Sequence, residues 1–194
     1  MKTNKAPKAL ILMILDKSGS MSNVQYDVIK SVNTLIDHQS TERGDADLSV
    51  FTFNNRSYHT VKPINFKQVS KWTSNEFTCR ETTALYDTII KAINSVPTSY
   101  TNVCVLIQTD GNDNESQTNP STVADTIQQK LDAGWQFLYM GADKSIVHNA
   151  KQIGLDNHAV EFKRDSKGIE QVFNEMSRKV SNFRASLDKT ILTN

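Results

Sequence analysis

The stretch that decides the fold is LILMILDKSGS, residues 10–20. Its first six residues are apolar without interruption, which is typical of a strand buried on both faces of a parallel sheet. Asp16 ends this run, and Ser18 and Ser20 follow at alternate positions, so their side chains can point the same way while the chain stays extended. Open α/β sheets bind ligands at the carboxyl ends of their strands, so these three side chains lie where a ligand is expected.

The residues of this loop suit a metal ion. Asp16, Ser18 and Ser20 offer one carboxylate and two hydroxyls, which are the hard oxygen donors that a small divalent cation such as Mg²⁺ prefers. Taken alone, the stretch leaves an alternative open, in which the two serines only cap the helix that follows.

Two later segments carry polar residues of the same kind. Thr83 stands where a helix is expected to begin, so its hydroxyl either caps that helix or binds a metal placed above it. Asp110 ends a second apolar run and is followed by Gly111, which again places a carboxylate at the end of a buried strand, although an Asp-Gly pair is also a common turn. Asp87, inside the expected helix, is interpreted as structural.

In this order the three segments resemble the three loops of the metal-ion-dependent adhesion site (MIDAS) of von Willebrand factor type A (vWA) domains. The resemblance runs from about residue 9 to about residue 154 and is to the small, single-domain kind found in bacteria and their phages. The family usually has glycine before the threonine, where this chain has Glu81 and Thr82, so Thr82 is an alternative to Thr83. The resemblance implies a site for Mg²⁺ (or Mn²⁺) made of Asp16, Ser18, Ser20, Thr83 and Asp110.

A cation held by two carboxylates and three neutral hydroxyls keeps an exchangeable position that a carboxylate of another molecule can fill. The resemblance therefore implies a metal-dependent protein-binding module, an adhesion or adaptor domain and not an enzyme. Two alternatives stay open: a phosphatase-like enzyme with Asp16 as nucleophile, and a structural assembly domain. Such phosphatases carry a second aspartate two residues later, where this chain has Ser18, and the nucleophile elbow and the P-loop motif are absent.

The resemblance also implies a way to transmit binding. In vWA domains that switch, the cation exchanges direct contact with the third-loop aspartate for contact with the second-loop threonine, and the final helix moves. Asp110 and Thr83 could make this exchange here, with a helix expected over residues 167–187 as the moving part. The alternative is that this helix is a fixed part of the core.

Composition narrows the partners and the compartment. The 22 basic and 21 acidic residues balance, and the basic residues are scattered, which disfavours nucleic acid and acidic membranes as partners. Cys79 and Cys104 are too few for a disulfide framework. The lysines before the apolar run imitate a signal peptide, but no small-x-small cleavage site follows. We expect a cytoplasmic monomer with no membrane-spanning segment and with a protein as its partner.

Alternating strands and helices predict an α/β fold: a Rossmann-like, three-layer α/β/α arrangement with a central, mostly parallel six-stranded sheet and one antiparallel edge strand. Pro63 is expected to end the third strand and Gly141 the fifth. Residues 1–8 are expected to form a flexible arm and residues 9–194 a single domain. Strands are expected near residues 9–15, 46–54, 58–61, 103–107, 135–140 and 159–162, and helices near 22–39, 83–95, 120–133, 143–152 and 167–187.

Overall fold

The computed structural model describes residues 8–142 and 145–192, without the side chains of residues 145–147 and 188–192. The expected arm before Lys8 and the expected helix start at Asp143 lie outside the described residues. The strands form one six-stranded sheet in the order β3-β2-β1-β4-β5-β6. They are β1 (Ala9–Asp16), β2 (Ala46–Phe53), β3 (Ser57–Asn65), β4 (Asn102–Thr109), β5 (Gln136–Ala142) and β6 (Ala159–Phe162).

Strand β1 lies in the middle of this sheet. It pairs in parallel with β2 on one side and with β4 on the other, and all eight of its residues are buried. Strands β4, β5 and β6 continue the parallel arrangement, whereas β3 pairs with β2 in antiparallel orientation. The predicted α/β sheet with one antiparallel edge strand is therefore confirmed.

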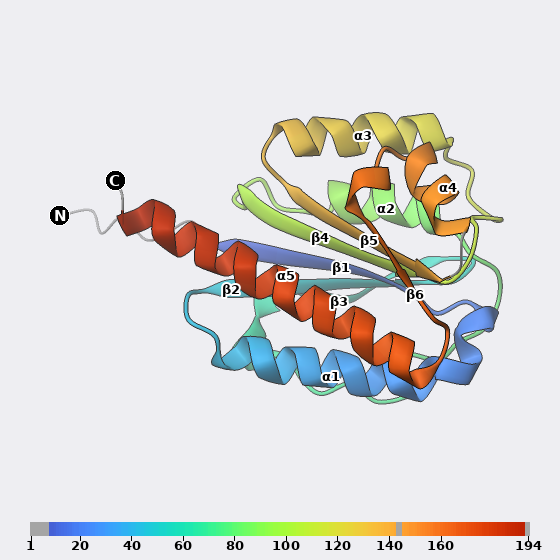
Figure 1. The fold of residues 1–194 in the computed structure, drawn as a ribbon, viewed down its shortest axis with the longest axis horizontal. Coiled ribbons are helices and arrows are strands. Elements are labelled where there is room, and N and C mark those ends of the chain that lie inside the picture. Colours follow the sequence, from blue (N-terminus) through green and yellow to red (C-terminus); the bar gives the residue numbers. More distant parts are fainter. Residues whose placement is uncertain (1–7, 143–144, 193–194) are drawn as a thin grey trace.

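Helices cover both faces of the sheet (Figure 1). Helices α1 (Gln25–Thr41) and α5 (Ser166–Leu192) lie on one face, and α2 (Leu85–Asn94), α3 (Pro120–Asp132) and α4 (Ser145–Gln152) lie on the other. Alternate residues of β1 divide between two hydrophobic cores: Ile11 packs on the side of α1 and α5, and Leu12 on the side of α2 and α3. Short 3₁₀ helices occupy Gly19–Val24 (η1), Phe66–Gln68 (η2) and Asp156–His158 (η3).

Two predicted strand ends were wrong. Strand β3 runs through Pro63 to Asn65, because an edge strand leaves backbone N–H groups without a sheet partner and a register shift opposite Ser49 absorbs the irregularity. Strand β5 runs through Gly141, which pairs with Thr109 on one side and Glu161 on the other. The two flanking strands hold this glycine in the sheet.

The helix predicted from residue 22 begins instead as the 3₁₀ helix η1, and its α-helical part begins at Gln25.

The irregular segment after β3 covers α1. Trp72 and Phe77 of this segment are buried in the core, and Asn33 of α1 exchanges two hydrogen bonds with the backbone of Trp72, at 2.7 and 3.0 Å. The segment therefore completes the hydrophobic core on this face.

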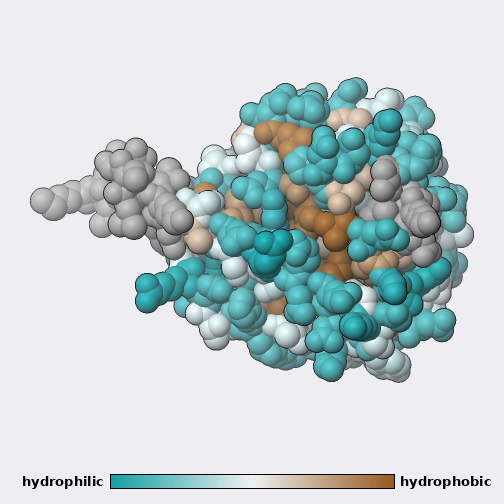
Figure 2. All heavy atoms as spheres, in the orientation of Figure 1, coloured by the Kyte–Doolittle hydropathy of each residue, from teal (hydrophilic) through white to brown (hydrophobic). Residues whose placement is uncertain are grey.

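The face seen in Figure 2 is mostly hydrophilic, with apolar atoms near its middle. A groove lies there between α5 and strands β5 and β6, and Leu138, Val160 and Phe183 are among its lining residues. Among the described helices, none is long and apolar enough to cross a membrane.

Candidate metal centre

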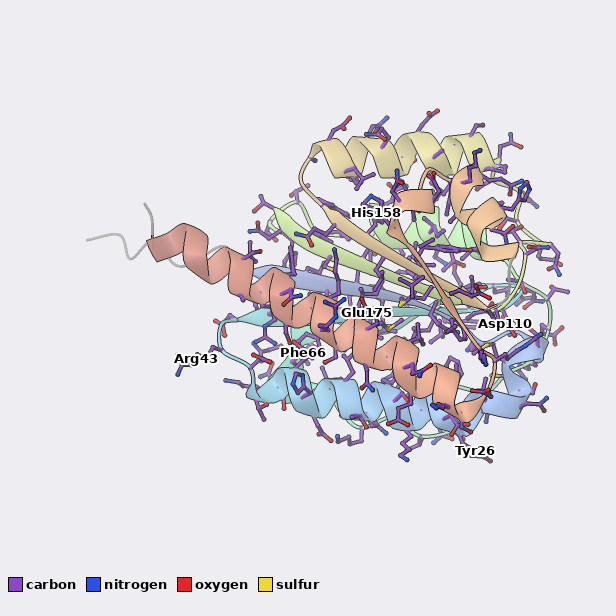
Figure 3. The ribbon with its side chains drawn as sticks, in the orientation of Figure 1. Tyr26, Arg43, Phe66, Asp110, His158 and Glu175 are labelled. Carbon is purple, nitrogen blue, oxygen red and sulfur yellow. The ribbon has the colours of Figure 1, made fainter. Side chains whose placement is uncertain are left out.

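The five predicted site residues lie on three loops at the carboxyl edge of the sheet. Asp16 is the last residue of β1 and Asp110 follows the last residue of β4, and these two strands are neighbours in the sheet. Figure 3 shows Asp110 at this edge, close to the turn that leads into α5. Parallel pairing of adjacent strands thus brings together two carboxylates that are far apart in the sequence.

Asp16 is a fully buried carboxylate with neutral hydrogen-bond donors. The backbone N–H of Ser18 donates to its Oδ1 at 2.7 Å, and the hydroxyl of Thr109 donates to its Oδ2 at 2.6 Å. Burial raises the pKa of Asp16 to about 6, and the negative charge of Asp110 acts in the same direction. A cation beside this carboxylate would stabilise its charged form and so lower this pKa.

The two serine hydroxyls connect the first loop to the third. The Oγ atoms of Ser18 and Ser20 lie 3.1 Å apart, and Ser20 donates to Asp110 Oδ1 at 2.7 Å. The second oxygen of Asp110, Oδ2, pairs with the guanidinium of Arg164 at 3.0 Å. Hydrogen bonds therefore join four of the five predicted ligands, with Asp16 connected through the backbone N–H of Ser18.

Thr83 belongs to the second loop, just before α2, and is buried. Asn114 holds its backbone from both sides: the Thr83 N–H donates to Asn114 Oδ1 at 2.9 Å, and the Asn114 N–H donates to the Thr83 carbonyl at 3.1 Å. The first and second loops are joined by the Gly19 N–H, which donates to the carbonyl of Glu81 at 2.9 Å. In the described part of the chain, no hydrogen bond joins the Thr83 hydroxyl to the other four side chains.

The two residues before Thr83 depart from the usual family pattern, and the structure shows how the chain adapts. Glu81 has a φ of 69°, a left-handed conformation that favours glycine. The hydroxyl of Thr82 is exposed and donates to Glu115 Oε2 at 2.8 Å. Because Thr82 is engaged elsewhere, these contacts favour Thr83 as the ligand from this loop, and that assignment stays a prediction.

The polar loop after β4 holds the start of α2 in place. Asp113 Oδ2 accepts from the backbone N–H of Tyr86 at 2.9 Å. In return, Asp87 of α2 accepts from the backbone N–H groups of Gln117 and Thr118 at 3.1 and 2.9 Å, and this structural role of Asp87 was predicted. The supporting roles of Asp113, Asn114 and Thr109 were missed. The density of Asp and Asn after a buried strand was a signal for such caps.

The chemistry of the donor set fits a hard divalent cation. Hydrogen bonds link the two carboxylates of Asp16 and Asp110 to the loop that carries the hydroxyls of Ser18 and Ser20. Oxygen donors of this kind suit Mg²⁺ or Mn²⁺. In the described part of the chain, no three His, Cys, Asp or Glu residues form a group that could hold a metal. The predicted set contains only two such residues, so hydroxyl groups would supply the other protein ligands.

Cys79 lies near this centre, where its thiol is half-buried. Burial raises the pKa of Cys79 to about 12, and the negative charges of Asp16 and Asp110 contribute in the same direction. The thiol is therefore protonated at neutral pH, which argues against a reactive thiolate.

No family model matches the sequence, and no curated protein sequence matches it. Solved structures do match. Proximal thread matrix protein 1 from the mussel byssus has a TM-score of 0.66 and 15% identity, over 90% of this chain and 46% of that one. The pilus adhesin SpaC from Lactobacillus rhamnosus GG has a TM-score of 0.68 and 13% identity, over 93% of this chain and 31% of that one.

A structure described as von Willebrand factor type A, from Catenulispora acidiphila, has a TM-score of 0.63 and 15% identity, over 88% of this chain and 42% of that one. The chain thus spans less than half the length of each of these three proteins. Identities this low carry information on the fold alone. The described residues have the fold of a von Willebrand factor type A domain.

Proposed function

We propose that the chain is a metal-dependent protein-binding module of the adhesion or adaptor kind. It binds Mg²⁺ (or Mn²⁺) through Asp16, Ser18, Ser20, Thr83 and Asp110, and an acidic residue of a protein partner completes the coordination of the ion. The observation that carries the proposal is the 2.7 Å hydrogen bond from Ser20 to Asp110, next to the buried carboxylate of Asp16.

The residues of this centre have separable roles in binding. Asp16 supplies a negative charge from inside the protein, where a bound cation compensates the cost of burying it. Ser18 and Ser20 add neutral oxygen atoms, so the ion keeps part of its charge for an incoming carboxylate. The ion itself supplies the Lewis acidity that attracts this carboxylate. Binding of this kind transfers no proton between the chain and its partner.

The similar structures are consistent with this class of function. One of them is described as a pilus adhesin and another as a thread matrix protein. We extend to this chain only the idea of a domain that binds other proteins. The identity of the partner would have to come from experiment.

We propose that the chain is not an enzyme. The phosphatase alternative needs a carboxylate two residues after Asp16 to act as general acid and base. This chain has Ser18 there, and a serine hydroxyl is not a general acid or base near neutral pH. Purified protein with Mg²⁺ should therefore not hydrolyse phosphate esters above background. Turnover that disappears in Asp16→Asn would favour the phosphatase.

A cytoplasmic location and a monomeric state belong to the same proposal. Both cysteines are free thiols, which agrees with a reducing compartment. Fractionation of the native cells and light scattering of the purified chain would check the two points. Recovery in the extracellular fraction, or a dimer mass, would contradict them.

The proposed function is tested by affinity capture from a lysate of the native cells, with Mg²⁺ or with EDTA. The immobilised chain should retain a protein in Mg²⁺, release it in EDTA, and fail to retain it when Asp16 is changed to Asn. Asp125→Asn, which makes the same chemical change at an exposed position of α3, is the matched control and should behave as the wild type. Equal capture in EDTA would contradict a metal-dependent partner.

A further inference from the structure

Arg164 brings a positive charge to the candidate metal centre from outside the three loops. It lies in the turn between β6 and α5, and its guanidinium pairs with Asp110 Oδ2 at 3.0 Å. The side chain of Asp110 is 0% exposed, whereas that of Arg164 is 39% exposed. The pair therefore joins a buried carboxylate to a long side chain that reaches in from the surface.

The turn that carries Arg164 is held on both sides. Asp165 caps α5 by accepting the Gly168 N–H at 2.7 Å, and Ser166 donates to Asp27 of α1 at 2.8 Å. A Cβ at Gly168 would lie 1.8 Å from the carbonyl oxygen of Lys163, so the backbone can approach this closely only with glycine. The turn that carries Arg164 is thus tied to α1 and to the first turn of α5, and the guanidinium reaches Asp110 from this turn.

The carboxylate of Asp110 is already shared between two partners. Oδ1 accepts the hydroxyl of Ser20, and Oδ2 pairs with Arg164. A divalent cation held by Ser20 and Asp110 draws on the same carboxylate, directly or through water. Because guanidinium and cation are both positive, each lowers the other's stabilisation by Asp110.

We propose that Arg164 is an internal counter-ion of the metal centre, and that it lowers the affinity for a divalent cation by competing for Asp110. This inference rests on the proposed function and adds a residue that sets the affinity of the same site. Arg164 is not a ligand, and it acts through Asp110.

The test is calorimetric titration of the full chain with Mn²⁺ alone, at low ionic strength. Arg164→Gln should bind Mn²⁺ about tenfold more tightly than the wild type, because the competing charge is gone. Arg164→Lys keeps the charge and should stay within about threefold of the wild type. Lys163→Gln is the matched control: it removes one positive charge from the neighbouring, exposed position and should change the dissociation constant less than about twofold.

A second readout separates competition from a purely structural role. Arg164→Gln should melt at a lower temperature than the wild type without Mn²⁺, since Asp110 loses its ion-pair partner, and should gain more from saturating Mn²⁺. Arg164→Met replaces the charge by an apolar side chain of similar length and gives the same comparison if the glutamine variant does not fold.

Three outcomes would overturn the inference. Unchanged or weaker binding in Arg164→Gln, with a wild type that binds Mn²⁺, would reject the competition and leave the proposed function standing. An equal gain in Lys163→Gln would show an effect of net charge alone. Absence of Mn²⁺ binding in both the wild type and the neutral variants would reject the proposed function and this inference with it.

Discussion

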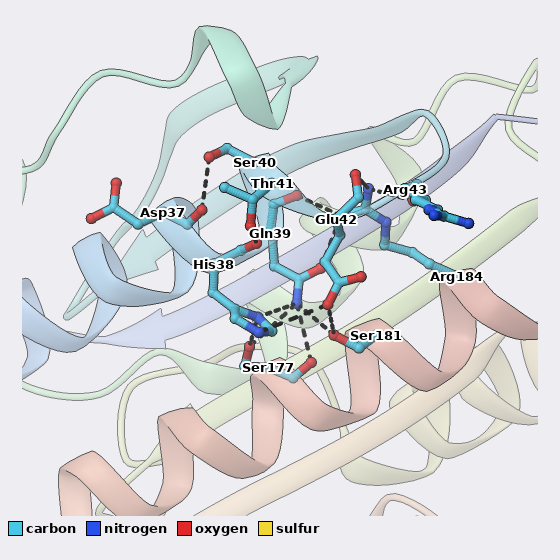
Figure 4. A network of polar contacts seen from close by, with 10 residues as sticks. All are labelled: Asp37, His38, Gln39, Ser40, Thr41, Glu42, Arg43, Ser177, Ser181 and Arg184. Carbon is cyan, nitrogen blue, oxygen red and sulfur yellow. Dashed lines mark hydrogen bonds and ion pairs between the residues drawn. The ribbon is translucent and has the colours of Figure 1, made fainter.

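Two arginines near the two ends of α5 differ in their burial and in the groups that they contact. Arg164, just before the helix, pairs with one carboxylate of the candidate metal centre and is 39% exposed. Arg184, in the last third of the helix, is 7% exposed and is surrounded by the end of α1 (Figure 4). Its guanidinium donates to the backbone carbonyls of Gln39, Glu42, Arg43 and Gly44 at 2.7–3.1 Å.

The two sets of contacts indicate which end of α5 can respond to binding. The carbonyl of Gln39 lies in the last turn of α1, and those of Glu42, Arg43 and Gly44 follow directly after it. Arg184 thus places a positive charge at the negative end of the helix dipole and satisfies carbonyls that the helix leaves without partners. Gln39 adds hydrogen bonds to Ser177 and Ser181 of α5, at 3.0–3.2 Å. These contacts favour the fixed core helix over the moving one, and leave Arg164 as the adjustable group.

The largest effect is expected when the buried arginine is removed. Arg184→Ala should lower the free energy of unfolding by about 3 kcal/mol, because several buried carbonyls lose a charged donor at once. Urea unfolding measures the change. Arg178→Ala, on the same helix but paired with Glu175 at the surface, is the control and should leave the urea midpoint unchanged. Equal effects of the two substitutions would contradict the assigned role of Arg184.

A second substitution examines the other end of α5. Gly168→Ala should destabilise the protein by about 2 kcal/mol, because the new Cβ meets the carbonyl of Lys163 and the turn must shift. Gly111→Ala adds a Cβ that meets nothing within 4 Å and should change stability by less than about 0.5 kcal/mol. A neutral Gly168→Ala in urea unfolding would mean that the turn carrying Arg164 is not fixed.

The smallest expected effect concerns the strained second loop. Glu81→Val should cost about 1 kcal/mol, because a β-branched residue tolerates a φ of 69° less well than glutamate does. Glu81→Gly should be neutral or slightly stabilising, since glycine adopts this conformation without strain. Thermal unfolding of both variants checks the pair, and a valine variant as stable as the glycine variant would remove the case for strain.

The sequence predicted the sheet and the position of the site for the same reason. An uninterrupted apolar run such as residues 10–15 is typical of a strand buried on both faces, and parallel strands end at one edge, so Asp16 and Asp110 were expected at the same edge. The pairing of β1 with β4 then brings these two strand ends together. The resemblance selected Ser18, Ser20 and Thr83 in addition. The contact between Ser20 and Asp110 agrees with that selection, and metal binding by these residues stays a prediction.

The contacts of both arginines could not be predicted from local patterns. Arg164 is 54 residues from Asp110 in the sequence, and Arg184 is 145 residues from Gln39. No periodicity relates such positions, and each depends on how α5 packs against α1 and the sheet. The prediction that Pro63 ends β3 failed for a similar reason, because tolerance of proline depends on the edge position and the register shift.

The central claim, a metal ion bound between Asp16 and Asp110, is tested most directly by thermal unfolding with and without Mg²⁺. Because the ion is expected to bind the folded state and not the unfolded one, saturating Mg²⁺ should raise the melting temperature of the wild type by about 5 °C or more. Asp16→Asn should lose this shift, and Asp125→Asn should keep it. A wild type without a shift, or an undiminished shift in Asp16→Asn, would contradict a metal centre at these residues.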